Sequence, residues 1–163
     1  NITLFSLQKN TIEQFTDFTK DLICELYYAM EAIDEKKLCA LLQDLQKSKR
    51  VFVYGHGHAS TLCSYVQNEL SAKGKETVIC DVDFAKKYVF YESDILIIIS
   101  INGNTFHFEK GVIQNILNCS VNTWLISCKK NIDFSEKFLY IPTIKEKYNA
   151  IILRHMIDFI LLH

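Results

Sequence analysis

Features that mark several other classes of protein are missing from this sequence. Lysine and arginine number 18 against 19 acidic residues, and the lysines stand in scattered pairs such as Lys86 and Lys87. Nucleic-acid-binding proteins concentrate positive charge on one surface. We therefore interpret these scattered lysines as solvent-exposed residues that do not bind DNA. No apolar run approaches the roughly 18 residues that a membrane-spanning helix needs, so we expect no contact with a membrane.

The cysteines lack the spacing of a metal site or of a disulfide framework. No two of them form a CxxC pair, and no signal peptide precedes them. All six lie within apolar runs: Cys24, Cys39, Cys63, Cys80, Cys119 and Cys128. We therefore expect reduced, mostly buried thiols in a cytoplasmic protein, with neither zinc nor disulfide bonds.

What the chain does contain is enough apolar residues for one domain with a sizeable core, 49% of 163. It begins at Asn1 rather than methionine and ends in an apolar segment, so we expect a fragment of a longer protein. Apolar residues three and four positions apart predict a long amphipathic helix over Lys9–Ala32. Asp34 is the predicted N-cap of a second helix, which runs through Leu45.

The segment Val51–Ser60 organises the rest of the chain. Val51 to Tyr54 are four β-branched or aromatic residues, which predicts a strand buried on both faces. Gly55 and Gly57 then predict a tight turn. A helix follows from Ser60 to Lys73, with Gly74 at its C-terminal cap. A helix N-terminus at the end of a buried strand favours an anion.

Strands and helices alternate to the end of the chain. The other predicted strands are Glu76–Cys80, Asp94–Ser100, Val121–Ser127 and Phe138–Ile141. The other predicted helices are a short one with Phe84, Ala85, Tyr88 and Val89, then Thr105–Leu117 and Lys147–Leu162. This alternation predicts an α/β fold, a doubly wound (flavodoxin- or Rossmann-like) parallel sheet of about five strands flanked by helices, with an N-terminal helical extension.

Two of the predicted strands end in polar loops that contain glycine and open a helix. One loop is Gly55–Ser60 and the other is Ser100–Thr105. Ligands of open parallel sheets bind beyond the carboxyl ends of the strands, where the strand order reverses. Hydroxyl, amide and backbone N–H donors from both loops can converge there on one anion.

These residues resemble the SIS (sugar isomerase) domain, which carries a Gly-x-Gly-x-Ser turn after its first strand and a later Ser-x-Ser-Gly-x-Thr loop that holds a sugar phosphate. Nearly the whole chain resembles the C-terminal effector domain of RpiR-type transcriptional regulators. Lys49–Tyr54 before the glycine turn, Lys73-Gly74, Asp81, Asp94–Ser100 and Asp158 carry this likeness. The resemblance implies that residues 1–47 are linker and dimerisation helices and that residues 48–163 form the phosphosugar-binding domain.

The resemblance also implies a ligand site on the two loops. Its candidate residues are Gly55, Gly57, His58, Ala59, Ser60, Ser100, Asn102, Gly103, Asn104 and Thr105. The sequence departs from the family where Ala59 and Asn102 replace serines and where Asn149 and Ala150 replace a Ser-Arg pair. Each hydrogen bond lost to a charged ligand costs about 1.5–3 kcal/mol unless Ser60 and the Asn102 amide compensate. A weakened or altered ligand preference is therefore an open alternative.

Three other interpretations of these residues remain open. His56 and His58 could hold a metal, although the sequence offers no third ligand nearby. The acid Asp81 after a glycine turn fits a dinucleotide site, but Ser60 replaces the third glycine of that pattern. An aldose-ketose isomerase of the same fold would need a general base, for which Glu109 and Glu146 are candidates.

We predict a cytoplasmic ligand-sensing domain of an RpiR-type regulator of carbohydrate metabolism, which binds a phosphorylated sugar or amino sugar without turning it over. No catalytic residue, metal or cofactor is expected. The implied partners are further copies of the chain, as a homodimer or tetramer, and DNA only through a separate helix-turn-helix domain.

Overall fold

The structure is a computed structural model that describes residues 10–105, 111–134 and 137–163. Its sheet has five parallel strands in the order β2-β1-β3-β4-β5. The strands are β1 (Arg50–Gly55), β2 (Glu76–Ile79), β3 (Asp94–Ser100), β4 (Asn122–Ser127) and β5 (Phe138–Tyr140). The helices are α1 (Thr11–Ala32), α2 (Glu35–Lys47), α3 (Ala59–Ala72), α4 (Phe84–Lys87), α6 (Gly111–Asn118), the 3-10 turn η1 (Glu146–Tyr148) and α7 (Asn149–Leu162). The predicted doubly wound parallel α/β fold is confirmed.

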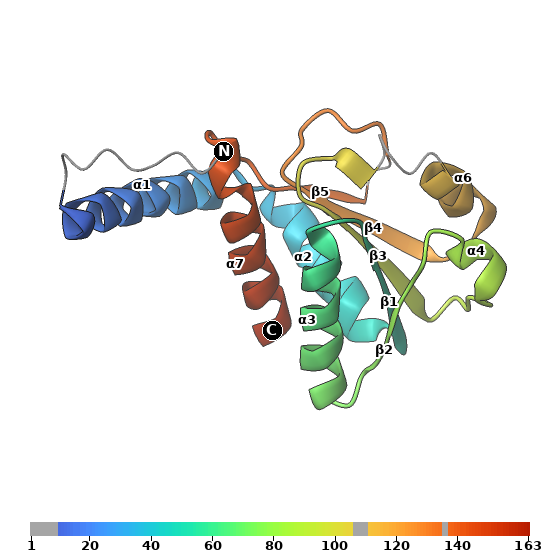
Figure 1. The fold of residues 1–163 in the computed structure, drawn as a ribbon. Helices are drawn as coiled ribbons and strands as arrows, with labels where there is room; N and C mark the ends of the chain where they lie inside the picture. Colours follow the sequence, from blue (N-terminus) through green and yellow to red (C-terminus); the bar gives the residue numbers. More distant parts are fainter. Residues whose placement is uncertain (1–9, 106–110, 135–136) are drawn as a thin grey trace.

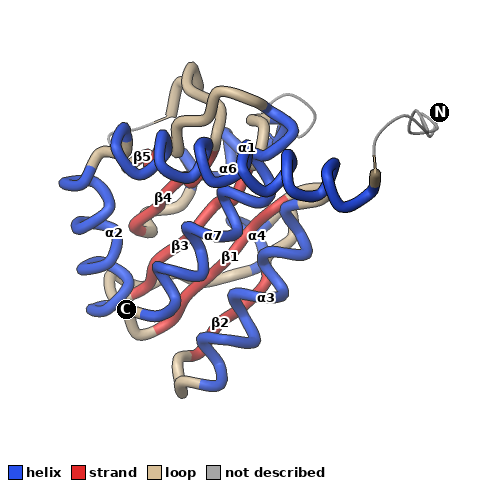
Figure 2. The backbone as a smooth tube through the Cα atoms, turned by 90° about the vertical axis from the view of Figure 1, so that its left-hand side faces the viewer, coloured by secondary structure: helices blue, strands red, loops and turns tan. Residues whose placement is uncertain are grey.

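Helices cover both faces of this sheet, as Figures 1 and 2 show. Alternate side chains of β1 supply both cores: Val51 and Val53 pack with α3 and α7, whereas Phe52 and Tyr54 pack with Phe84 of α4. All four β1 residues are buried, as the run of β-branched and aromatic residues predicted. The strands thus form a rigid layer from which loops project at the carboxyl edge.

Local sequence signals set the ends of two helices where they were expected. Asp34 caps α2, because its Oδ1 accepts a hydrogen bond of 3.1 Å from the Lys37 backbone N–H. Gly74 follows α3 with a φ of 78°, and the backbone N–H of Lys75 returns to the Leu70 carbonyl. A residue with a side chain would be strained in this left-handed conformation, so glycine ends the helix.

The two N-terminal helices are attached differently to the sheet. On α2, Leu41 and Leu45 lie in the core, and Asp44 accepts hydrogen bonds from Asn122, Trp124 and Lys137. Burial raises the pKa of the Asp44 carboxyl, but these hydrogen bonds outweigh it and lower the pKa to about 2. On α1 only Glu25 and Ala29 are buried, and Figure 1 shows its N-terminal half extending away from the sheet.

Several boundaries differ from the prediction. The last helix begins at Asn149 rather than Lys147, because Glu146–Tyr148 form a 3-10 turn. The helix α4 ends at Lys87, and Tyr88 is extended. Much of the predicted helix Thr105–Leu117 lies outside the described residues, although Asn104 and Thr105 are helical and α6 covers Gly111–Asn118.

The six cysteines are all free, but they are less buried than expected. Cys63, Cys80 and Cys128 are buried and Cys119 is half-buried, whereas Cys24 and Cys39 are exposed on α1 and α2. Within the described ranges, no helix combines the length and the apolar character needed to cross a bilayer.

Candidate functional site

The candidate site lies at the carboxyl ends of β1 and β3, which pair side by side from Arg50–Asp94 to Gly55–Ile99. The chain leaves β1 through α3 on one face of the sheet and leaves β3 toward α6 on the other face. The strand order therefore reverses between β1 and β3, which is where ligands of open α/β sheets bind. A cavity of about 290 Å³ occupies this point.

The first loop is shaped by close packing. A side chain at Gly55 would place its Cβ 2.9 Å from both the Ala59 carbonyl oxygen and the Cys63 Sγ, so only glycine lets α3 start so close to β1. Gly57 has a φ of 61° and completes the turn. Ala59 is buried at the first turn of α3, and the Ser60 hydroxyl donates a 2.7 Å hydrogen bond to the Gly57 carbonyl. This loop uses its hydroxyl to hold its own backbone.

The second loop keeps a hydroxyl without a partner. Ser100 is 1% exposed, and its Oγ is the only buried side-chain oxygen or nitrogen without a hydrogen-bond partner in the described part of the chain. Thr105 is also buried at the helical turn that follows. Gly103 has a φ of 75°, and a Cβ there would lie 2.9 Å from the Lys129 side chain. A buried hydroxyl without a partner costs free energy, which a bound polar ligand can return.

A third wall comes from the segment around the start of α7, where the family resemblance had marked only Asn149 and Ala150, as replacements of a Ser-Arg pair. Glu146 and Lys147 of η1 and Ala150 of α7 line the cavity. Glu146 was predicted only as a candidate base, and Lys147 only as the start of a helix. No local pattern marks Glu146 and Lys147 as ligand residues, because they reach the site through tertiary packing after β5.

Most of the predicted site residues line this one cavity. The predicted residues at the cavity are Gly57, His58, Ala59, Ser100, Asn102, Asn104 and Thr105. Gly55, Ser60 and Gly103 lie outside its lining and shape the two loops instead. His56, Ile101, Glu146, Lys147 and Ala150 complete the lining and were not among the predicted ligand-binding residues.

The third wall is joined to the second loop by the amides of the buried Asn149 and the exposed Asn102. The Thr143 hydroxyl donates a 2.6 Å hydrogen bond to Asn149 Oδ1, and Asn149 Nδ2 donates a 2.7 Å hydrogen bond to Asn102 Oδ1. Asn102 thereby keeps its Nδ2 hydrogens for the cavity. Asn102 and Asn149, two residues at which the sequence departs from the family pattern, therefore contact each other.

The lining can bind a polar anionic molecule. Lys147 brings a positive charge to the edge of the cavity, although its Nζ lies against α1, 3.7 Å from Asp21 and 4.8 Å from the centre of the Tyr148 ring. Ser100 and Asn102 supply a hydroxyl and an amide, and Glu146 can accept hydrogen bonds from sugar-type hydroxyls. The described residues contain no group of three His, Cys, Asp or Glu side chains that could hold a metal, so none of them supplies a third ligand to His56 and His58.

Comparisons with known proteins find likeness in structure. No family model matches the chain, and no curated protein matches its sequence. The Vibrio vulnificus NanR protein complexed with ManNAc-6P is 14% identical with a TM-score of 0.73, covering 91% of this chain and 61% of NanR. This chain thus spans less than two thirds of NanR.

Two further solved structures share the architecture over most of both chains. The sugar isomerase domain of an RpiR transcription factor from Sphaerobacter thermophilus is 14% identical with a TM-score of 0.69, covering 91% of this chain and 87% of that one. A putative sugar-phosphate isomerase from Listeria monocytogenes is 16% identical with a TM-score of 0.71, covering 93% and 86%. The chain has the SIS fold.

Proposed function

We propose that this chain is the ligand-sensing domain of an RpiR-type transcriptional regulator of carbohydrate metabolism and that it binds a phosphorylated sugar or amino sugar. The single observation that carries this proposal is the buried Ser100 hydroxyl, which lines the cavity at the β1–β3 switch point and has no partner. A phosphate oxygen there would accept its hydrogen bond.

The proposed ligand orientation follows from the charges of the lining. The phosphate lies against Ser100 and Thr105, while His58 and Lys147 supply donors from the two other walls. The sugar hydroxyls face Asn102 and Glu146. NanR of the same fold was solved with ManNAc-6P, which supports a sugar phosphate as the ligand class.

The departures from the family pattern favour a weaker or altered preference for the sugar. Ala59 offers no hydroxyl, and Ser60 does not replace it, because Ser60 lies outside the cavity lining and its hydroxyl bonds to the Gly57 carbonyl. Compensation therefore falls to the Asn102 amide and to His58, whose side chain makes no cap hydrogen bond with α3.

The test is a thermal-shift and calorimetry panel. Its ligands are ManNAc-6P, glucosamine 6-phosphate and glucose 6-phosphate, each paired with the unphosphorylated sugar, together with NAD⁺. At about a hundredfold excess over Kd, one phosphosugar should raise Tm by several degrees, whereas the unphosphorylated sugars and NAD⁺ should not. No shift with any phosphosugar at millimolar concentration contradicts the proposal.

Binding without turnover is part of the proposal, and an aldose-ketose isomerase is the alternative. The alternative is favoured by Glu146, a carboxylate that lines the cavity and could move a proton between sugar carbons. Incubation of the panel sugars with the protein, followed by chromatography, should give no isomer. Turnover that is lost in Glu146→Gln would establish the isomerase.

The regulator proposal includes a homodimer or tetramer, a cytoplasmic location, and DNA contact only through a helix-turn-helix domain outside these 163 residues. We also propose that residues 1–47 serve linkage and dimerisation and that residues 48–163 bind the ligand. An apolar groove of about 430 Å³ between α1 and α7 supports the oligomer. Ile23, Tyr27 and Met30 of α1 line it and are exposed.

A second copy of α1 suits this groove. The same side of α1 continues through Thr19 and Thr16 to Ile12, and both threonine hydroxyls bond back to main-chain carbonyls of α1. Their methyl groups can therefore be buried without leaving a polar atom unpaired. By sedimentation, the protein should weigh at least twice the 18.9 kDa of one chain, and Ile23→Glu should lower that mass because it breaks the contact between the two α1 helices. Val89→Glu, at an exposed apolar residue before β3, is the matched control.

A further inference from the structure

The third wall of the candidate site has little structure of its own. It follows β5, the edge strand, and between Tyr140 and Asn149 it contains only the 3-10 turn η1. This segment nevertheless places Glu146 and Lys147 at the cavity. Its position must therefore be fixed by contacts with other elements.

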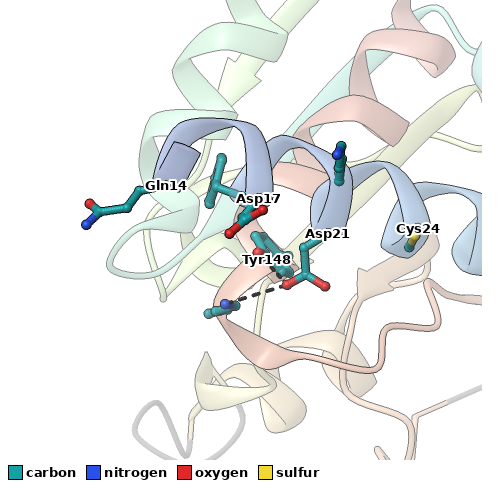
Figure 3. A pocket seen from close by; sticks show the side chains of 8 residues that line it. Gln14, Asp17, Asp21, Cys24 and Tyr148 are labelled. Atoms are coloured by element: carbon teal, nitrogen blue, oxygen red, sulfur yellow. Dashed lines mark hydrogen bonds and ion pairs between the residues drawn. The ribbon is translucent and has the colours of Figure 1, made fainter. Parts of the chain in front are cut away.

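Helix α1 supplies those contacts from outside the sheet. Glu25 is 2% exposed, and its Oε2 accepts a 2.9 Å hydrogen bond from the backbone N–H of Ile144. One turn earlier, Asp21 accepts a 2.5 Å hydrogen bond from Lys145 Nζ and a 2.7 Å one from the Tyr148 hydroxyl. Figure 3 shows Asp21 of α1 pointing toward Tyr148. The wall is thus held at three successive points by one helix.

The charges support this attachment. Hydrogen bonds from Lys145 and Tyr148 lower the pKa of the Asp21 carboxyl, and the bond to Asp21 raises the pKa of Lys145. Asp21 also lies 3.7 Å from Lys147 Nζ, the cation at the cavity. The Asp21 carboxylate therefore influences the position of the Lys147 ammonium.

The contact continues from the wall to the second loop of the site. Thr143 is adjacent to Ile144, and its hydroxyl bonds to Asn149, which bonds to Asn102. Asn149 is 4% exposed, so its two amide bonds cannot be exchanged freely for water. A path of hydrogen bonds, with one covalent step between Ile144 and Thr143, thus runs from α1 through the wall to Asn102, which lines the cavity.

We propose that Glu25 and Asp21 are positioning residues for the candidate site, and that Asn149 conveys the position of the wall to the amide of Asn102. The consequence for sugar-phosphate affinity rests on the proposed function, whereas the positioning itself does not. If a ligand draws Lys147 or Asn102 toward itself, thermodynamic reciprocity requires that α1 responds.

The first test needs no ligand. Hydrogen exchange of the Ile144 amide and the NMR resonances of the Asn102 side-chain amide are compared in the wild type and in Glu25→Ala. Exchange at Ile144 should rise about tenfold, and the Asn102 signals should shift. Glu25→Gln retains an acceptor oxygen and should restore most of the protection. Glu31→Ala, at an exposed position of the same helix, is the matched control and should change neither.

A second variant guards against a folding defect in Glu25→Ala. Tyr148→Phe removes only the hydroxyl that bonds to Asp21 and leaves the buried ring in place. It should also raise exchange across 144–148. Unchanged exchange in both variants, or raised exchange with unshifted Asn102 signals, overturns the proposal.

Calorimetry with ManNAc-6P then separates the two proposals. Glu25→Ala and Asn149→Ala should each weaken binding about tenfold, whereas Glu31→Ala should bind as the wild type does. If the wild type does not bind ManNAc-6P while exchange and NMR respond as expected, the positioning stands and this ligand is wrong. If the variants respond in exchange but bind as tightly as the wild type, the positioning role is wrong.

Discussion

The two loops at the carboxyl edge both contain glycine and a serine, but they use the serine hydroxyl differently. In the first, Ser60 bonds to the Gly57 carbonyl, so the hydroxyl stabilises the turn. In the second, Ser100 is buried with no partner. The first loop therefore serves the close packing of α3 on β1, whereas the second loop leaves the Ser100 hydroxyl available to bind a ligand. A motif that pairs two glycine- and hydroxyl-containing loops does not by itself tell which one carries the binding energy.

The largest effect should come from breaking the packing of the first loop. In Gly55→Ala the new Cβ would lie 2.9 Å from the Ala59 carbonyl oxygen and from the Cys63 Sγ, and the carbonyl, which is backbone, cannot move without shifting α3. We expect a loss of about 2–3 kcal/mol in the free energy of unfolding, measured with denaturant. Gly57→Ala, where φ is 61° but space is open, should cost only about 1 kcal/mol. Equal losses would contradict the packing role of Gly55.

Replacing each of the two serines with alanine tests which hydroxyl binds the ligand. Ser100→Ala should weaken binding of a phosphosugar about tenfold or more, because a charged hydrogen bond is lost. The ligand-free protein should become slightly more stable, since a buried unpaired hydroxyl is removed. Ser60→Ala should leave affinity unchanged and slightly reduce stability, because it loses the bond to Gly57. Affinity is measured by calorimetry and stability by thermal denaturation for both variants. If Ser60→Ala weakened binding and Ser100→Ala did not, the ligand would bind to the first loop.

The smallest effect should come from making the loops more alike. Ala59 lines the cavity and is buried, so Ala59→Ser places a hydroxyl where this chain has none. We expect phosphosugar affinity to improve a few-fold by calorimetry, about 1 kcal/mol or less, because part of the gain repays desolvation of the hydroxyl. Ser64→Ala, farther along the exposed side of α3, is the control. Weaker binding in Ala59→Ser would mean that the hydroxyl is too large for the occupied site.

Sequence patterns predicted the parts of the molecule that depend on near neighbours. The unbroken run of β-branched and aromatic residues Val51–Tyr54 predicted a strand buried on both faces, and Asp34 predicted the start of α2. The same reasoning gave two of the three walls of the cavity, because both follow strands of the expected parallel sheet. It could not show that the Ser60 hydroxyl turns back to Gly57, since that depends on the rotamer and the turn.

The geometry of the third wall and its support by α1 could not be predicted from local sequence, for a physical reason. Glu25 meets Ile144 across 119 positions of sequence, and no periodicity or spacing encodes such a contact. The segment before α7 was expected to be helical from Lys147, whereas the 3-10 turn Glu146–Tyr148 places Glu146 and Lys147 at the cavity. Tertiary contacts decided this element, as they often decide short ones.

The long separation between Glu25 and Ile144 has a consequence for synthesis in the cell. A ribosome completes α1 early, at about 5–20 residues per second, and the partner of Glu25 emerges several seconds later. Until then the Glu25 carboxylate has no hydrogen-bond partner in the third wall. The contact also closes a loop of 119 positions, which is slow to form. The cavity should therefore be completed late in folding. A nascent chain that stops before β5 could form the first loop but could not yet bind a ligand between three walls.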